Sequence, residues 1–474
     1  MVTPLRFVSQ RLVLGLLTAG SLLAARTPAA AQWVQQNSNL PANGGITSLS
    51  VVDANTVWAA GFDYSQARGT AYNGYTRTTN GGTTWTAGTI SAAASYSFNN
   101  ISAASSTVAW ASFAGTGTNA GGYLYYTADG GTTWTPQLTS AYSVTSGGRQ
   151  NGVLAFSATN VVVAGDPRPG LAGFEIYTTA NAGTTWTAAT SVPTASTGET
   201  GSPGTLTTVA GANPAARACW FGTSTGRVLR STDSGTTWAV ANTGLTQVTA
   251  LAFTSATVGL ALNANAASIT NSIAYTQDGG ATWQLRTPGG AGLVYPTSVS
   301  GVPGQPNTFV CAGYIPITPT RALSGSSYTT DGGTTWDILD TQVLHTAVAF
   351  LNGTTAWSGG VATAASSGTT GGMFKGMLPA TALATTPALA AGSVSVFPNP
   401  ATTAFTVRVP ALAGVAQTEA RLYNALGQEV ARRAAALPSS GAQLEFGTAS
   451  LAPGIYTLRV QAGEANVTKQ VSIQ

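Results

Sequence analysis

The chain consists of short apolar segments separated by stretches rich in Gly, Ser and Thr, and within many segments apolar and polar residues alternate. Residues 46–51 (ITSLSV), 248–253 (VTALAF) and 346–351 (TAVAFL) are examples. Alternation with a period of two is typical of half-buried β-strands, and Gly allows the tight turns between them. The sequence therefore predicts an all-β protein.

One octet with the pattern [S/T]-x-[D/N]-x-G-x-T-W occurs six times, and its Asp or Asn positions lie 49, 52, 52, 45 and 53 residues apart. A period near 50 is typical of propellers. The Asp or Asn oxygen can accept bonds from turn N–H groups, and the indole can be buried. We therefore interpret the octets as structural turns. Their Asx and Trp residues are Asn80, Trp85, Asp129, Trp134, Asn181, Trp186, Asp233, Trp238, Asp278, Trp283, Asp331 and Trp336.

Two further strand patterns precede each octet and one strand follows it. The apolar pattern that usually ends in Gly, as in residues 56–61, occurs seven times, once more than the octet. Four strands in each of seven units predict a seven-bladed β-propeller over residues 32–378. The last unit, residues 345–377, has only three strands, so we expect the N-terminal residues 33–36 to supply the fourth and remove an open edge.

The first 31 residues predict a signal peptide, with Arg6 and Arg11 before an apolar run and a small-residue cleavage site at residues 29–31. Its removal leaves 16 of the 19 basic residues (Arg6, Arg11 and Arg26 are lost) against 15 acidic ones. This balance argues against a nucleic-acid partner. No later segment is long and apolar enough to predict a membrane span. Export further allows a disulfide between Cys219 and Cys311, but the repeat places them two blades apart, so two buried thiols are the better interpretation.

The C-terminal part has a different pattern. Residues 379–393 are a Pro-, Ala- and Thr-rich stretch that predicts a linker. Residues 394–474 carry no octet and contain seven short alternating segments, which predict a small Ig-like β-sandwich.

These motifs resemble known families. The octet resembles the Asp box, or BNR repeat, of sialidase-superfamily propellers, where it lies away from the active site. The order of residues 165–167 (GDP), 174–177 (FEIY) and 198–199 (GE) is similar to that of photosystem II stability/assembly-factor-like propellers. The Asp-box resemblance implies that the octets belong to propeller blades. The second resemblance also implies only the propeller scaffold, because a shared fold does not establish a shared function.

The C-terminal module resembles the type A sorting domain of the type IX secretion system, on residues 396–401 (VFPNPA), 422–430 (LYNALGQEV), 451–460 (LAPGIYTLRV) and 468–474 (TKQVSIQ). The resemblance implies that residues 394–474 contact the outer-membrane secretion machinery and that the protein is secreted and anchored at the cell surface. The module is usually cleaved in that family. A carbohydrate-binding or adhesive sandwich is the alternative.

Catalytic motifs are sparse. The single His and the absence of a phosphate or dinucleotide motif predict no metal and no cofactor. We expect a non-enzymatic surface scaffold that binds a glycan or a protein, with a secreted glycoside hydrolase and a purely structural surface protein as alternatives. The ligand residues are expected on the propeller face opposite the octets, although a structural ion-pair cluster that joins the third and fourth blades is the better interpretation of the charged ones. They are Arg149, Asp166, Arg168, Glu199, Tyr295, Tyr314, Arg321 and His345.

Overall fold

The computed structural model describes residues 33–474 except 67–70, 95, 116–120, 143–147, 169, 211–217, 264–272, 319–320, 342, 366–367, 380–393, 413–414, 425–426, 439 and 464. The expected signal peptide and nearly all of the expected linker lie outside the described residues. In the described part the regular structure is β, apart from one short 3-10 helix, η1 (Ser91–Ala93). The predicted all-β class is confirmed.

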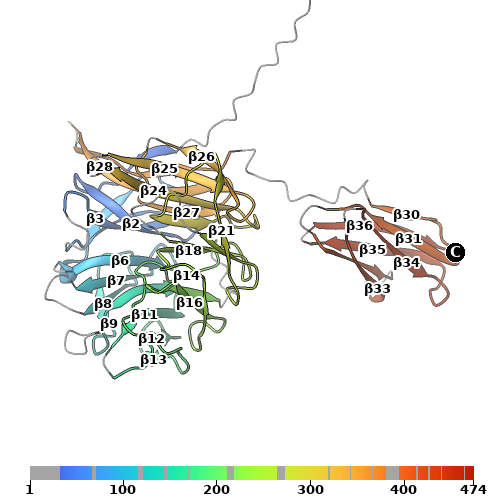
Figure 1. Ribbon diagram of the computed structural model, residues 1–474, viewed down its shortest axis with the longest axis horizontal. Coiled ribbons are helices and arrows are strands. Elements are labelled where there is room, and N and C mark those ends of the chain that lie inside the picture. Colours follow the sequence, from blue (N-terminus) through green and yellow to red (C-terminus); the bar gives the residue numbers. More distant parts are fainter. Residues whose placement is uncertain are drawn as a thin grey trace, which may run out of the picture.

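Up to β29 the described strands form antiparallel sets of four in which neighbours in the sequence are mostly neighbours in the sheet (Figure 1). A single pairing of Gly45 with Val361 joins the first and last sets into one eight-stranded sheet. The seven sets found in the described residues fit the repeat, in which one hairpin follows another. Their strands are β2 (Gly44–Val51), β3 (Val57–Asp63), β4 (Gly74–Thr78) and β5 (Thr86–Thr89); β6 (Tyr96–Ala103), β7 (Ala109–Gly115), β8 (Gly122–Thr127) and β9 (Thr135–Gln137); β10 (Gln150–Ala155), β11 (Val161–Pro167), β12 (Phe174–Thr179) and β13 (Thr187–Ala188); β14 (Thr207–Thr208), β15 (Cys219–Gly222), β16 (Arg227–Ser231) and β17 (Ala239–Asn242); β18 (Ala250–Phe253), β19 (Gly259–Leu262), β20 (Ile273–Thr276) and β21 (Gln284–Arg286); β23 (Ser298–Gly301), β24 (Phe309–Thr318), β25 (Arg321–Thr329) and β26 (Thr335–Asp340), with β22 (Gly289–Gly290) parallel to β26; and β27 (Ala347–Asn352), β28 (Thr355–Ala365), β29 (Gly368–Gly376) and β1 (Val34–Asn37).

The first strand of every set lines one central channel, so the sets are arranged radially as the blades of a β-propeller. The second strands carry large apolar residues into the contacts between blades. Trp58, Trp110 and Trp357 are fully buried there. Burying a large side chain stabilises the fold by roughly 1.5–3 kcal/mol, so these contacts hold the ring of blades together.

The two ends of the propeller meet in one blade. β1 pairs antiparallel with β29, from Val34 opposite Lys375 to Asn37 opposite Gly372. Trp33, just before β1, donates from Nε1 to Ser326 Oγ (3.1 Å) in the preceding blade, and its ring lies 5.0 Å from that of His345. The edge of the last blade is thereby paired rather than open.

The two cysteines, in β15 and β24, are free and buried. They belong to different blades that are separated by the β18–β21 blade. Burial raises the pKa of the Cys311 thiol to about 12. Both therefore pack as small apolar side chains.

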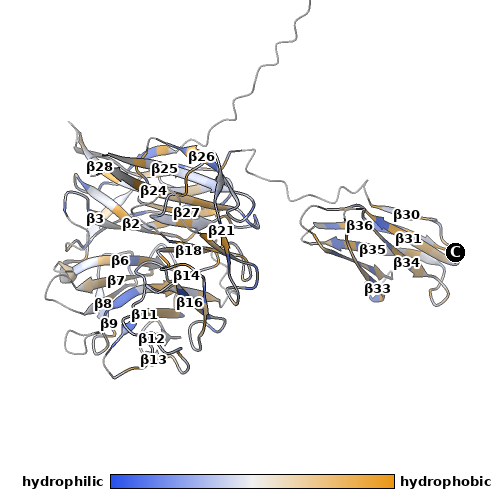
Figure 2. Ribbon diagram, in the orientation of Figure 1, coloured by the Kyte–Doolittle hydropathy of each residue, from blue (hydrophilic) through white to orange (hydrophobic). Residues whose placement is uncertain are grey.

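Residues 395–473 form a two-sheet sandwich whose inner faces meet in a single core. Phe405 and Phe446 stack at its centre, with ring centroids 5.1 Å apart. Figure 2 shows both hydrophobic and hydrophilic stretches on these strands, as expected for sheets with one buried face. The first sheet contains β30 (Ser395–Phe397), β31 (Ala404–Val409) and β34 (Ala442–Gly447), and the second contains β33 (Glu429–Ala436), β32 (Gln417–Tyr423), β35 (Gly454–Ala462) and β36 (Ala465–Ile473).

Candidate binding site at the central channel

The octets form one type of turn, which the last octet illustrates. Thr329 Oγ1 donates to Asp331 Oδ1 (2.8 Å) and accepts from the N–H of Gly333 (2.9 Å). Asp331 Oδ1 accepts from the N–H of Thr335 (2.9 Å), whose hydroxyl donates to Oδ2 (2.7 Å). Gly333 has φ +92°, in a region that favours Gly. These bonds occupy the carboxylate, so its role is to hold the turn.

The two octets with Asn use the same turn with one bond reversed. Asn80 Oδ1 accepts from the N–H of Thr84 (2.9 Å), while its Nδ2 donates to the Thr84 hydroxyl (2.8 Å). Asn181 makes the same two bonds with Thr185 (both 2.9 Å). A Thr hydroxyl can donate or accept, so either amide or carboxylate satisfies it.

The octets also accept hydrogen bonds from neighbouring blades, a role that the sequence did not reveal. Side chains of one blade donate to carbonyls of the next blade's octet: Tyr75 Oη to Gly131 O (2.9 Å) and Trp220 Nε1 to Gly279 O (2.8 Å). Lys375 Nζ donates to Gly81 O (2.8 Å) and so joins the last blade to the first. Of the octet indoles, three are buried and three are half-buried; the buried ones are Trp85, Trp238 and Trp336, and the half-buried ones are Trp134, Trp186 and Trp283.

Four of the proposed ligand residues lie at the junction of the third and fourth blades, but they make separate contacts. Asp166 Oδ1 accepts from Asn151 Nδ2 (2.6 Å) and from the N–H of Gly201 (2.8 Å). Arg168 forms an ion pair with Glu175 (3.0 Å). Arg149 is exposed and lowers the pKa of Asp166, whereas burial, the larger effect, raises it.

Glu199 is only 3% exposed and forms a bidentate ion pair with Arg227, including a bond of 3.0 Å from Nε. Thr225 Oγ1 (2.7 Å) and the N–H of Ser196 (2.8 Å) also donate to it. Burial alone would raise the pKa of Glu199, but these donors, Arg227 first, lower it to about 2. The group is therefore a fixed anion in a structural ion pair.

The other four proposed residues do not join them. Tyr295 is 3% exposed and packs in the core between the fifth and sixth blades. His345 is fully buried: Nδ1 hydrogen-bonds Ser358 Oγ (2.5 Å), Nε2 lies 3.5 Å from Asp340 Oδ2, and burial lowers its pKa. Tyr314 is 38% exposed, and the structure describes only the backbone of Arg321, paired with Thr318. The structure therefore does not bring the described side chains of these residues together in one pocket, and their role in ligand binding stays a prediction.

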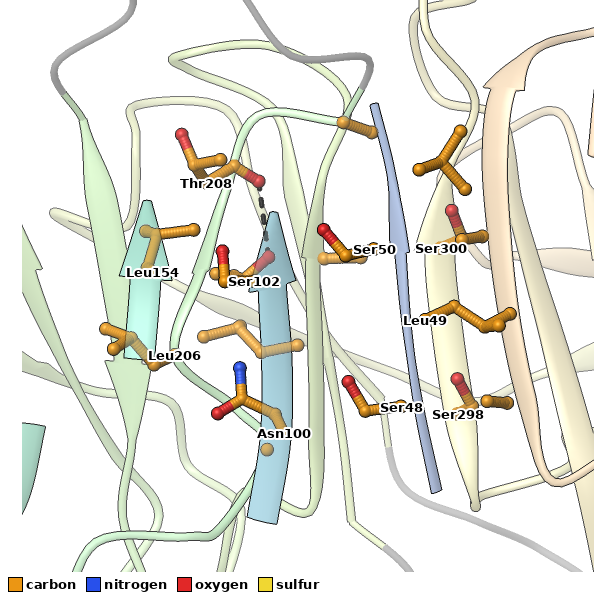
Figure 3. A pocket seen from close by; sticks show the side chains of 18 of the residues that line it. Ser48, Leu49, Ser50, Asn100, Ser102, Leu154, Leu206, Thr208, Ser298 and Ser300 are labelled. Carbon is orange, nitrogen blue, oxygen red and sulfur yellow. Dashed lines mark hydrogen bonds between the residues drawn. The ribbon is translucent and has the colours of Figure 1, made fainter. Parts of the chain in front are cut away.

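The central channel forms a cavity with a volume of ≈ 300 Å³, which is lined by the first strand of each blade. Figure 3 shows Ser, Thr and Asn side chains alternating with Leu along its wall. None of the eight proposed residues and no charged side chain lines it in the described part of the chain. The wall is therefore neutral and polar.

Most wall hydroxyls already have partners, because they cap the inner edge of the next blade. Ser50 Oγ accepts from the N–H of Ala103 and Ser102 Oγ from that of Ala155, both at 2.9 Å. Ser300 Oγ accepts likewise from Phe350 (3.1 Å). These pairs are 53, 53 and 50 residues apart, about one repeat. They satisfy edge donors that a sheet otherwise exposes.

A second cavity of ≈ 240 Å³ adjoins one end of the channel and shares lining residues with it. Equivalent positions of the blades come together here. In each blade, one residue of the first strand pairs with the Trp of the second strand or with the residue that takes its place, and the position in question lies three residues before it. We call these positions the mouth ring. A Thr or Asn at the start of the first strand was a visible signal for it. The mouth ring comprises Thr47, Asn99, Asn151, Gly204, Thr249, Thr297 and Thr346, and all except Asn151 line this cavity.

Comparison with known proteins identifies the C-terminal module. Residues 395–474 match the secretion system C-terminal sorting domain. The protein is therefore secreted and belongs at the cell surface, where this module engages the type IX machinery. No curated protein matches the chain.

Solved structures with similar folds are propellers with low sequence identity. YCF48 from Cyanidioschyzon merolae is 15% identical over 74% of this chain and 99% of its own, with a TM-score of 0.49. A GH74 xyloglucanase from Xanthomonas campestris is 14% identical over 73% of this chain and 53% of its own (TM-score 0.48), and a GH74 enzyme from Niastella koreensis is 14% identical over 90% and 66% (TM-score 0.46). Similarity at this level does not bear on activity.

In the described ranges, no cluster of three or more His, Cys, Asp or Glu side chains could hold a metal ion. No helix there has the length and apolar character needed to cross a membrane.

Proposed function

We propose that this protein is a non-enzymatic binding scaffold, displayed at the cell surface by its sorting domain, that holds a glycan on the propeller face around the channel mouth. The observation that carries the proposal is the neutral polar lining of the channel and mouth, which offers hydroxyl and amide groups. Such groups fix a ligand through hydrogen bonds without chemistry.

The state of the acidic residues supports binding rather than hydrolysis. A glycosidase needs a protonated carboxyl group near a second carboxylate. Glu199 has a pKa of about 2 because Arg227 and its other donors hold the anion, so it cannot act as the acid at neutral pH.

Glycoside hydrolysis remains the second candidate because of one observation. Burial raises the pKa of Asp166, a property that general acids require. Its Oδ1 is engaged by Asn151 and Gly201, however, which favours a positioning role.

A glycan array and a reducing-end assay, both with the exported protein, test the two candidates. The proposal expects retention of specific glycans and no release of reducing ends from a polysaccharide panel. Release that disappears in Asp166→Asn, but not in the control Asp337→Asn on the exposed face of β26, would establish hydrolysis instead.

A further inference from the structure

We infer that the mouth ring is the binding site itself, and that it takes the end of a neutral, hydroxyl-rich glycan chain. This inference rests on the proposed function and names its ligand class and residues. It depends on four features of the ring: backbone irregularity, hydrogen-bonding capacity, neutrality and size.

In the first three blades, a backbone irregularity of the first strand falls at the mouth ring. The pairing of the first and second strands shifts between Ile46 and Ser48, between Phe98 and Asn100, and between Gln150 and Gly152. In each case the residue skipped belongs to the ring. A bulge redirects a side chain away from the regular alternation of the strand, and bulges are frequent beside binding sites. Three successive blades therefore share a feature that strand pairing alone does not require.

Two ring residues keep hydrogen-bonding capacity that the described residues do not use. Thr346 is 6% exposed and its Oγ1 has no hydrogen-bond partner there. Asn151 is 1% exposed; its Nδ2 donates to Asp166, and its Oδ1 also has no partner. Buried polar atoms are normally paired, so an unpaired hydroxyl beside a cavity is suited to a ligand's polar group. Thr346, which lines the mouth, is therefore the ring residue best placed to bond a ligand, whereas Asn151 lies outside the cavity.

The lining favours an uncharged ligand. Of the described residues, no Asp, Glu, Lys or Arg lines the mouth. Thr hydroxyls both donate and accept, as sugar hydroxyls do, whereas an anionic ligand would lose its hydration without gaining an opposite charge. Phe98 and Pro203 add an apolar surface, and Phe98 is held by Phe113, whose ring centroid is 4.0 Å away. Hydroxyls beside a fixed aromatic ring suit the two kinds of surface that a sugar ring presents.

The same wall disfavours an extended peptide. A peptide that adds a strand to a sheet needs free backbone groups at the edge. At the inner edges of the second, third and seventh blades, Ser50, Ser102 and Ser300 already occupy the N–H groups of the neighbouring strand. A protein ligand would therefore lack main-chain partners on this side.

The size of the mouth cavity indicates that it takes only the end of a glycan chain. The mouth, at ≈ 240 Å³, is smaller than the ~300–1,000 Å³ of pockets for drug-sized ligands. It continues into the channel, because Gly204, Leu251 and Ser298 line both cavities. One sugar unit can enter while the rest of the glycan lies on the outer face.

The test measures binding of hexasaccharides of glucose, xylose and mannose by isothermal titration calorimetry, with oligogalacturonate as the anionic counterpart. The full exported protein is compared with Thr47→Val and Thr346→Val, which remove one hydroxyl each and keep the side-chain shape. Thr86→Val is the matched control, since Thr86 is exposed on the outer strand β5 of the same blade as Thr47. Unfolding midpoints of all variants are recorded alongside.

We expect one neutral oligosaccharide to bind and oligogalacturonate not to bind. Each ring variant should weaken binding about threefold to tenfold, the effect of one lost hydrogen bond, while Thr86→Val has no effect. Neutral-glycan binding that both ring variants retain in full would overturn the inference but leave the proposed function standing. Binding only of the anionic glycan would do the same. Failure of the protein to bind any glycan, in this panel or on an array, would overturn both.

Discussion

The Glu199–Arg227 ion pair gives the sharpest test of how the propeller is held together. The pair joins the segment after the third blade to β16 in the fourth, and both glutamate oxygens are engaged. Glu199→Gln keeps the side-chain shape but removes the charge, so that the guanidinium of Arg227, whose side chain is 20% exposed, is left half-buried without its partner.

The magnitude follows from the pKa. Arg227 and the other donors lower the pKa of Glu199 from 4.5 to about 2. One pKa unit corresponds to about 1.4 kcal/mol, so the ionised group stabilises the fold by up to about 3 kcal/mol at pH 7. A depressed pKa gives stability that is complete above pH 4.5 and is lost as the pH falls towards 2. At pH 3 the contribution is about 1.4 kcal/mol.

Urea unfolding followed by Trp fluorescence measures this effect in the propeller alone, since all eleven Trp lie between residues 33 and 357. We expect Glu199→Gln to lower the free energy of unfolding by about 2–3 kcal/mol at pH 7 and by about 1 kcal/mol at pH 3. The exposed Asp337→Asn should change it by less than about 0.5 kcal/mol. Adding Arg227→Gln should restore part of the loss. An equal loss at both pH values would refute the ion-pair explanation.

Four further variants, at three positions, test the turns, the inner edges and the ring closure by the same assay. Asp331→Ala should cost about 1–3 kcal/mol because it leaves turn N–H groups unpaired, whereas Asp331→Asn, which copies the turn of Asn80, should cost under about 1 kcal/mol; equal losses would contradict the turn assignment. Ser50→Ala should destabilise the propeller by about 0.5–1.5 kcal/mol, since the N–H of Ala103 loses its acceptor; no loss would mean that solvent replaces the hydroxyl. Trp33→Ala should cost about 1.5–3 kcal/mol by removing a half-buried side chain that packs beside the last blade, and an unchanged midpoint would contradict a role of this contact in closing the ring.

Sequence alone determined the features that depend on residues close together in the chain. The octet turn uses a Thr or Ser, an Asx, a Gly and a second Thr within one octet, so its role could be read from the pattern, including the exchange of Asp for Asn. Strand alternation likewise indicated the all-β class and the C-terminal sandwich. The pairing of β1 with β29 was expected from the missing strand of the last repeat.

Only the tertiary structure decided which groups meet across blades. Glu199 pairs with Arg227, Tyr75 donates to Gly131 O, and Ser50 accepts from an N–H one repeat away, because radial packing brings neighbouring blades together. Glu199, which looked available in the sequence, is therefore committed to its ion pair with Arg227. The channel mouth is formed instead by ordinary Thr and Asn residues, whose importance arises from the geometry of the ring and not from their chemical type.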